Sequence, residues 1–164
     1  MRWLRVWWPA LVWAACIFTF STSAFTSENT SKVIIPFLHW LLPHLSQETL
    51  LVMHHLIRKS GHFTEYFIFS LLVLRGMRAG QKHTRLGSAL AAIVVAAVYA
   101  GFDEFHQSFV PGRTAAFADV LLDTAGGIAA QVVAALVVLL GDVREKQKRK
   151  VRAPATGSAG SRGN

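Results

Sequence analysis

The chain has 164 residues, of which 52% are apolar and only 16% are charged, and its mean hydropathy is +0.38. Soluble domains average about 45–50% apolar and 25% charged residues, so this composition excludes an ordinary soluble domain. The formal net charge of +8 comes from short basic clusters between apolar segments, which is typical of membrane topology signals and not of nucleic-acid binding. The single cysteine, Cys16, excludes an intrachain disulfide and a cysteine-based metal site.

Four apolar segments are candidates for membrane-spanning helices, at residues 4–20, 63–74 with its flanks, 86–102 and 120–140. A bilayer core about 30 Å thick needs roughly 20 mostly apolar helical residues. The second segment is the shortest, because Lys59, His62 and Glu65 precede it and Arg75 closes it. We therefore expect an all-α fold, a bundle of four transmembrane helices in which the polar end of the second helix lies inside the bundle or among headgroups.

The connection between the first two spans, residues 21–58, mixes polar residues with two apolar runs bounded by Pro36 and Pro43. Because proline ends or kinks helices, we expect short interfacial helices on the outer membrane surface there. The predicted organisation is a first span with this outward loop (residues 1–58), a polytopic membrane core (59–141) and a basic, disordered cytoplasmic tail (142–164). Small residues four apart, such as Ala92 with Ala96 and Gly126 with Ala130, predict contact between the third and fourth spans.

Lysine and arginine are distributed unevenly among the connections. Thirteen of the 17 lie before the first span, between the second and third, or after the fourth. The positive-inside rule then places both termini in the cytoplasm. The first segment also fits a signal peptide, since Arg2 and Arg5 precede the apolar stretch and small residues follow at 22–24, although four tryptophans and Pro9 argue against cleavage.

Polar residues gather at the predicted outward ends of the second, third and fourth spans. Acidic side chains cost about 2.5–3.5 kcal/mol each at the centre of a transmembrane helix, so their presence indicates either structural ion pairs or a site. The residues expected to bind a ligand are Lys59, His62, Tyr66, Asp103, Glu104, Gln107, Arg113 and Asp119. Asp123 lies one turn after Asp119 on the same face. In the structural alternative, Lys59 or Arg113 pairs with these carboxylates only to stabilise the bundle.

The chemistry of this set favours an anionic ligand and leaves catalysis open. The guanidinium of Arg113 follows a Pro-Gly turn, and its planar fork suits a phosphate or carboxylate. An imidazole can carry protons near neutral pH, so the catalytic candidates are His62, Glu65, Asp103 and Glu104. A metal site built from His62, His106 and carboxylates lacks the histidine spacing of zinc-binding helices, so neither a metal nor another cofactor is expected.

The pattern Lys59-x-x-His62-Phe63-x-x-Tyr66, followed by Asp103-Glu104-x-x-Gln107-x-Phe109-x-Pro111-Gly112-Arg113 and then Asp119, resembles the VanZ family of small bacterial membrane proteins. The resemblance covers roughly residues 58–130. It implies a four-helix domain in the bacterial cytoplasmic membrane and, from the founding member, low-level resistance to the glycopeptide teicoplanin, without an established reaction. The chain departs from the family at Asp123, where relatives often carry asparagine, so a role for Asp123 does not carry over.

Two functions are compatible with these features. The leading hypothesis is an envelope membrane protein whose outer-face site binds a lipid-linked or anionic envelope component and so modulates glycopeptide susceptibility. The alternative is an integral membrane hydrolase or transferase that acts on a lipid-linked envelope precursor. In both cases the expected partner is a membrane lipid or lipid-linked component, and no nucleic acid is expected.

Overall fold

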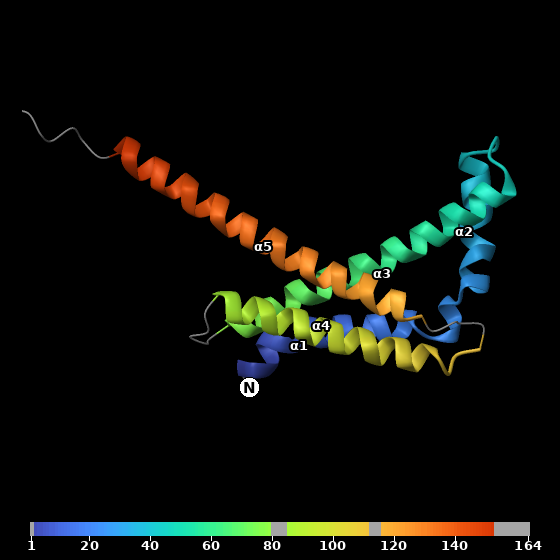
Figure 1. Ribbon diagram of the computed structural model, residues 1–164, viewed down its shortest axis with the longest axis horizontal. Helices are drawn as coiled ribbons and strands as arrows, with labels where there is room; N and C mark the ends of the chain where they lie inside the picture. Colours follow the sequence, from blue (N-terminus) through green and yellow to red (C-terminus); the bar gives the residue numbers. More distant parts are fainter. Residues whose placement is uncertain (1, 80–84, 112–115, 153–164) are drawn as a thin grey trace, which may run out of the picture. The chain divides into compact units, whose positions relative to one another are not determined.

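The computed structural model describes residues 2–79, 85–111 and 116–152, and this part of the chain is helical (Figure 1). Its elements are α1 (Arg2–Phe20), the short 3-10 helix η1 (Ser23–Phe25), α2 (Ser27–Leu41), α3 (Gln47–Arg78), α4 (Arg85–Gln107) and α5 (Phe117–Arg152). No strand occurs among the described residues, so the predicted all-α class is confirmed.

Three helices are long and apolar enough to cross a membrane, over Trp3–Phe20, Arg85–Gln107 and Phe117–Arg149. They correspond to the first, third and fourth predicted spans. Large apolar side chains such as Leu90 and Val98 of α4 are more than half exposed, which suits a helix whose solvent is lipid. The second predicted span lies in α3, which is not among the three, so a fourth transmembrane helix stays a prediction.

The chain divides into two compact units, Met1–Gln131 and Val132–Asn164. In the first unit α3 packs against α1, α2 and α4, and it buries Tyr66, Phe69 and Val73. Because neighbouring helices cover α3, it needs fewer apolar residues than a helix surrounded by lipid. This central position is the physical reason that α3 is less apolar than α1 and α4.

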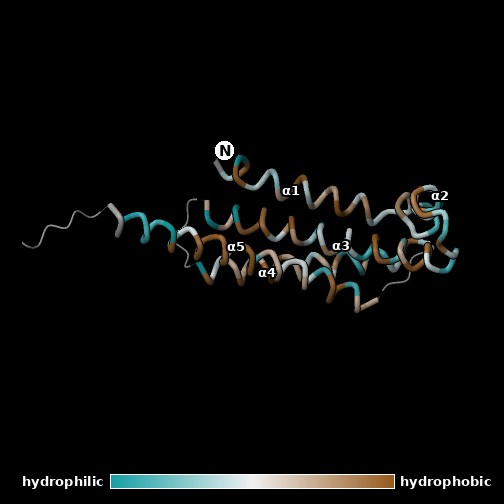
Figure 2. The backbone as a smooth tube through the Cα atoms, turned by 90° about the horizontal axis from the view of Figure 1, so that it is seen from above, coloured by the Kyte–Doolittle hydropathy of each residue, from teal (hydrophilic) through white to brown (hydrophobic). Residues whose placement is uncertain are grey.

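The C-terminal part of α5 differs from the predicted tail. Helix α5 continues to Arg152, so the expectation of disorder from residue 142 was wrong for residues 142–152, and residues 153–164 lie outside the described part. Figure 2 shows the hydrophobic part of α5 giving way to hydrophilic residues toward its C-terminal end. Those residues are mostly lysine, arginine, glutamate and glutamine, which have high helix propensity, so the helix extends without apolar packing.

The connection after α1 also differs from the short interfacial helices that were expected. Helix α2 has 15 residues and contains Pro36, so the apolar residues on both sides of this proline lie in one helix. Helix α3 begins at Gln47 and runs unbroken past Arg58. Side chains cap both starts, since Thr26 accepts a hydrogen bond from the Asn29 backbone N–H in α2 and Ser46 accepts one from that of Thr49 in α3. A proline removes only one backbone hydrogen bond, and the packing of α2 on α3 offsets that loss.

A small hydrogen-bond network joins η1 and α2 to α3. The Nη1 of Arg58 donates to the Phe25 carbonyl oxygen and to the Thr30 hydroxyl, each at 2.9 Å. The same hydroxyl lies 3.1 Å from Nε2 of His54, which is buried. These contacts hold the start of α2 against α3 beside the site described below.

Helix α5 approaches α3 and α4 through small residues. The Ser70 hydroxyl donates to the Gly127 carbonyl oxygen at 3.1 Å, and Nε2 of Gln131 donates to the Ser70 hydroxyl at 2.7 Å. A Cβ on Gly127 would lie 3.2 Å from that of Ala96 in α4. The predicted contact between the third and fourth spans is therefore confirmed.

Replacing Gly126 by alanine is expected to destabilise the bundle, because the added Cβ would overlap the carbonyl oxygen of Phe63 in α3. Moving one helix to relieve such an overlap costs roughly 1–3 kcal/mol. Thermal unfolding in detergent measures the effect, with Gly101→Ala as the control, since nothing lies within 4 Å of a Cβ there. Equal unfolding temperatures for the two variants would contradict the close approach of α5 to α3.

The docking of α2 on α3 is expected to weaken in acid. Burial, reinforced by electrostatic interaction with Arg58 and His55, lowers the pKa of His54 below its ordinary value of 6.5. His54 lies ahead of the apolar part of α3. In the unfolded chain His54 has its ordinary pKa, and in the folded protein its pKa is lower. At a pH between these two values the folded state binds fewer protons than the unfolded state, so stability is lost as the pH falls below about 6.5. Unfolding temperatures measured at about pH 7.5 and pH 5.5 should differ less in His54→Gln than in the unmodified protein, and an equal difference would assign the effect to other groups.

Candidate functional site

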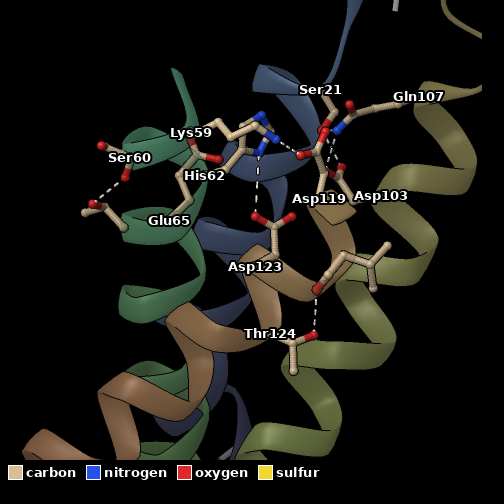
Figure 3. Close-up of polar contacts among 12 residues, drawn as sticks. Ser21, Lys59, Ser60, His62, Glu65, Asp103, Gln107, Asp119, Asp123 and Thr124 are labelled. Atoms are coloured by element: carbon tan, nitrogen blue, oxygen red, sulfur yellow. Dashed lines mark hydrogen bonds and ion pairs between the residues drawn. The ribbon is translucent and has the colours of Figure 1, made fainter. Parts of the chain in front are cut away.

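Polar side chains from four helices meet at one place in the first unit (Figure 3). Helices α1 and α4 end there and α5 begins there, while α3 passes by with its middle turns. We call these side chains the polar cluster: Ser21, Lys59, His62, Asp103, Gln107, Asp119 and Asp123. The chain direction of the helices thus brings together residues that are up to 102 positions apart in the sequence.

Asp103 is the most completely hydrogen-bonded carboxylate of the polar cluster. The Ser21 hydroxyl donates to its Oδ1, and Nε2 of Gln107 donates to its Oδ2 at 2.8 Å. The Gln107 amide also donates to the Ser21 hydroxyl oxygen at 3.3 Å. All three side chains are buried, so this triad connects the end of α1 to the last turns of α4. Ser21 was missed from the sequence because it is one of several hydroxyl residues that follow the first apolar segment.

Lys59 and Asp119 form an ion pair between α3 and α5. Their side chains are 35% and 29% exposed, so solvent screens the pair in part. This pairing is the arrangement that the structural alternative predicts for Lys59. The ammonium group of Lys59 is therefore already engaged by a carboxylate of the same protein.

His62 faces Asp123, which the sequence-based set of ligand-binding residues did not include. The Nδ1 of His62 lies 3.9 Å from Oδ1 of Asp123, and the Asp123 side chain is only 2% exposed. Ligand atoms of His62, Asp103 and Asp123 all lie within 4.8 Å of one another, so these three residues form a group that could hold a metal ion. The sequence signal for Asp123 was its place one turn after Asp119.

The other expected site residues have different surroundings. Glu104 is buried and accepts a hydrogen bond from the Ala116 backbone N–H, at the start of α5. Tyr66 is fully buried, and its ring packs near Phe69 and Tyr99. Arg113 lies outside the described residues.

A pocket of about 250 Å³ adjoins the polar cluster. Four apolar side chains from α1, η1, α2 and α3 form much of its wall: Phe20, Phe25, Ile34 and Ile57. Arg58, His62 and Glu65 contribute polar groups to the same pocket. Sequence reasoning treated Arg58 only as a loop charge, because the pocket exists only once α2 has folded against α3. An apolar wall with a guanidinium and an imidazole suits a ligand that is both apolar and anionic.

A double-mutant cycle on Lys59→Gln and Asp119→Asn is expected to give a coupling free energy of about 0.2–1 kcal/mol, the range for partly exposed ion pairs. Chemical unfolding in detergent measures the coupling. The matched control is the pair Lys32 and Glu28, whose side chains are 63% and 82% exposed and which should couple less. Coupling no larger than in this control would contradict a stabilising role for the pair.

Comparison with known proteins supplies the family of this chain. A search of curated proteins found no significant match, and a search of solved structures found none either. The family model described as VanZ/LLP1 matches residues 6–139, which include every member of the polar cluster and the whole pocket. Since the match extends over most of the chain, this protein belongs to the VanZ/LLP1 family of membrane proteins.

Proposed function

We propose that this VanZ/LLP1 family protein binds a lipid-linked or anionic component of the bacterial cell envelope in the pocket beside the polar cluster. The observation that carries the proposal is the composition of the pocket, in which the Arg58 guanidinium lies among the apolar side chains of Phe20, Phe25, Ile34 and Ile57. A lipid-linked anion has the matching parts, since its chain is apolar and its headgroup is charged.

Arg58 suits an anionic headgroup better than Lys59 does. Hydrogen bonds from its Nη1 to Phe25 and Thr30 hold the guanidinium in place, so little conformational freedom is lost when a ligand binds. A guanidinium also presents a planar fork of donors that matches phosphate geometry. We therefore assign the anion-binding role to Arg58, with His62 beside it in the pocket.

The positive-inside rule supports an outward-facing pocket. Thirteen of the 17 lysine and arginine residues lie in the segments assigned to the cytoplasm, and the loop that contains α2 lies opposite. We propose that both termini are cytoplasmic and that binding at the outer face modulates susceptibility to teicoplanin-type glycopeptides, as the resemblance to VanZ implies. This placement would give the site access to envelope components outside the cytoplasmic membrane.

A second candidate function is a membrane hydrolase or transferase for the same class of ligand. The observation that favours it is the imidazole of His62 facing a buried carboxylate, Asp123, at 3.9 Å. A carboxylate can orient a histidine that acts as general acid or base. Asp103 is less suited to proton transfer, because both of its oxygens already accept hydrogen bonds.

Binding of a polyprenyl phosphate to the purified full chain in nanodiscs tests the proposal. Arg58→Gln is expected to weaken binding about 10-fold or more, since a hydrogen bond to a charged group contributes about 1.5–3 kcal/mol. Arg75→Gln is the matched control, because Arg75 lies on the same helix and its Nη1 donates to the Val6 carbonyl oxygen away from the pocket. Equal losses in both variants would show only general attraction between cations and anions.

The same preparation separates binding from catalysis. Turnover of a polyprenyl-linked precursor that is abolished in His62→Gln would favour the enzyme, whereas binding without turnover would exclude it for that substrate. Cells that express Arg58→Gln and Arg75→Gln at equal protein levels test the glycopeptide role. Identical teicoplanin susceptibility in the two strains would contradict that role.

A further inference from the structure

Side chains from three helices form a potential metal site inside the polar cluster. We propose that His62 of α3, Asp103 of α4 and Asp123 of α5 bind a divalent transition-metal ion. Ligand atoms of these residues all lie within 4.8 Å of one another. The proposal goes beyond the proposed function and does not rest on it, because it concerns the metal alone.

The donor set indicates which class of cation fits. One imidazole nitrogen and two carboxylate oxygens suit zinc, manganese or ferrous ions, whereas calcium and magnesium prefer sites made of oxygen alone. Three protein ligands are also the number found in catalytic zinc sites, which keep a further position for water or substrate. The structure thus points to a transition metal with an open coordination position.

The separation of His62 and Asp123 is close to that of two ligands of one ion. Ligand atoms around a tetrahedral ion with bonds of about 2.1 Å lie roughly 3.4 Å apart. The His62 Nδ1 and the Asp123 Oδ1 are 3.9 Å apart, which is too long for a hydrogen bond and close to the separation of two ligands. Figure 3 shows these two side chains facing each other, with Asp103 nearby.

Buried acceptor and hydroxyl groups at the same place provide a second line of evidence. Within the described part of the chain, neither Oδ1 of Asp123 nor the hydroxyl of Tyr66 has a hydrogen-bond partner. The two side chains are 2% and 0% exposed, and Tyr66 lies within electrostatic range of both Asp103 and Asp123. A buried carboxylate oxygen without a donor is costly. A bound cation would supply the missing partner of the Asp123 oxygen, and the open coordination position of the cation would lie near the polar cluster.

The charge balance of the polar cluster favours the same occupant. Its three carboxylates, on Asp103, Asp119 and Asp123, face one ammonium group, on Lys59, which pairs with Asp119. Asp103 and Asp123 are both buried, and one divalent cation carries the charge that neutralises two such carboxylates. Ser21 and Gln107 hold the Asp103 carboxylate, as outer partners of metal ligands commonly do.

Metal titration of the full chain in detergent tests the proposal without any lipid ligand. The protein is stripped with EDTA, exchanged into metal-free buffer and titrated with zinc or manganese chloride, and calorimetry with elemental analysis gives affinity and stoichiometry. We expect one ion per chain. Asp123→Asn and His62→Gln each remove a ligand, so each should lower the affinity by more than about 10- to 100-fold. That range is typical of substitutions of residues that only hydrogen-bond to metal ligands. Asp119→Asn removes a neighbouring carboxylate that is not a ligand, so it should lower the affinity less than about 10-fold.

The unfolding temperature in EDTA shows whether each variant is folded. Zinc or manganese should raise this temperature for the unmodified protein and leave it unchanged for Asp123→Asn. If Asp123→Asn does not fold, His62→Gln supplies the same comparison. Failure of the unmodified protein to bind one ion, or equal losses of affinity in Asp119→Asn and Asp123→Asn, would overturn the proposal. Arg58→Gln should retain the metal, so failure of the lipid-binding proposal remains distinguishable.

Discussion

The interaction on which the site depends is the hydrogen bonding of the buried Asp103 carboxylate. A carboxylate in an apolar bundle is stable only when donors or counter-charges surround it. Ser21 and Gln107 supply the donors, and in doing so they tie the end of α1 to the end of α4. The first turns of α5 lie at the same place. The need of a buried carboxylate for hydrogen-bond donors therefore also determines where four helices converge (Figure 3).

Helix α3 links this cluster to the rest of the first unit. It packs against α1, α2 and α4, and it carries Arg58 and Lys59 on one turn and His62 on the next. A helix covered by protein tolerates such residues where a helix in lipid would not. The low apolar content of α3 therefore follows from its central position, and the polar residues that weaken it as a membrane span are the ones that build the site.

The two proposed binding sites differ in charge and share one residue. The pocket contains the Arg58 guanidinium and apolar walls, which suit an anion with an apolar chain. The polar cluster has more carboxylates than cations, which suits a metal ion. His62 borders both. A metal ion held there would lie beside the headgroup of a ligand in the pocket, and its open position would suit a phosphate oxygen.

Composition and periodicity determined the all-α class, the three apolar helices and the gathering of polar residues, because a bilayer demands about 20 apolar residues per span whatever the tertiary structure. They also marked Lys59, His62, Asp103, Gln107 and Asp119, since charged and amide groups beside lipid are costly. Only the tertiary structure paired Lys59 with Asp119, added Ser21, placed Asp123 opposite His62, and gave Arg58 a pocket. Those outcomes depend on which helices lie side by side, and that choice is made by packing between segments far apart in the chain.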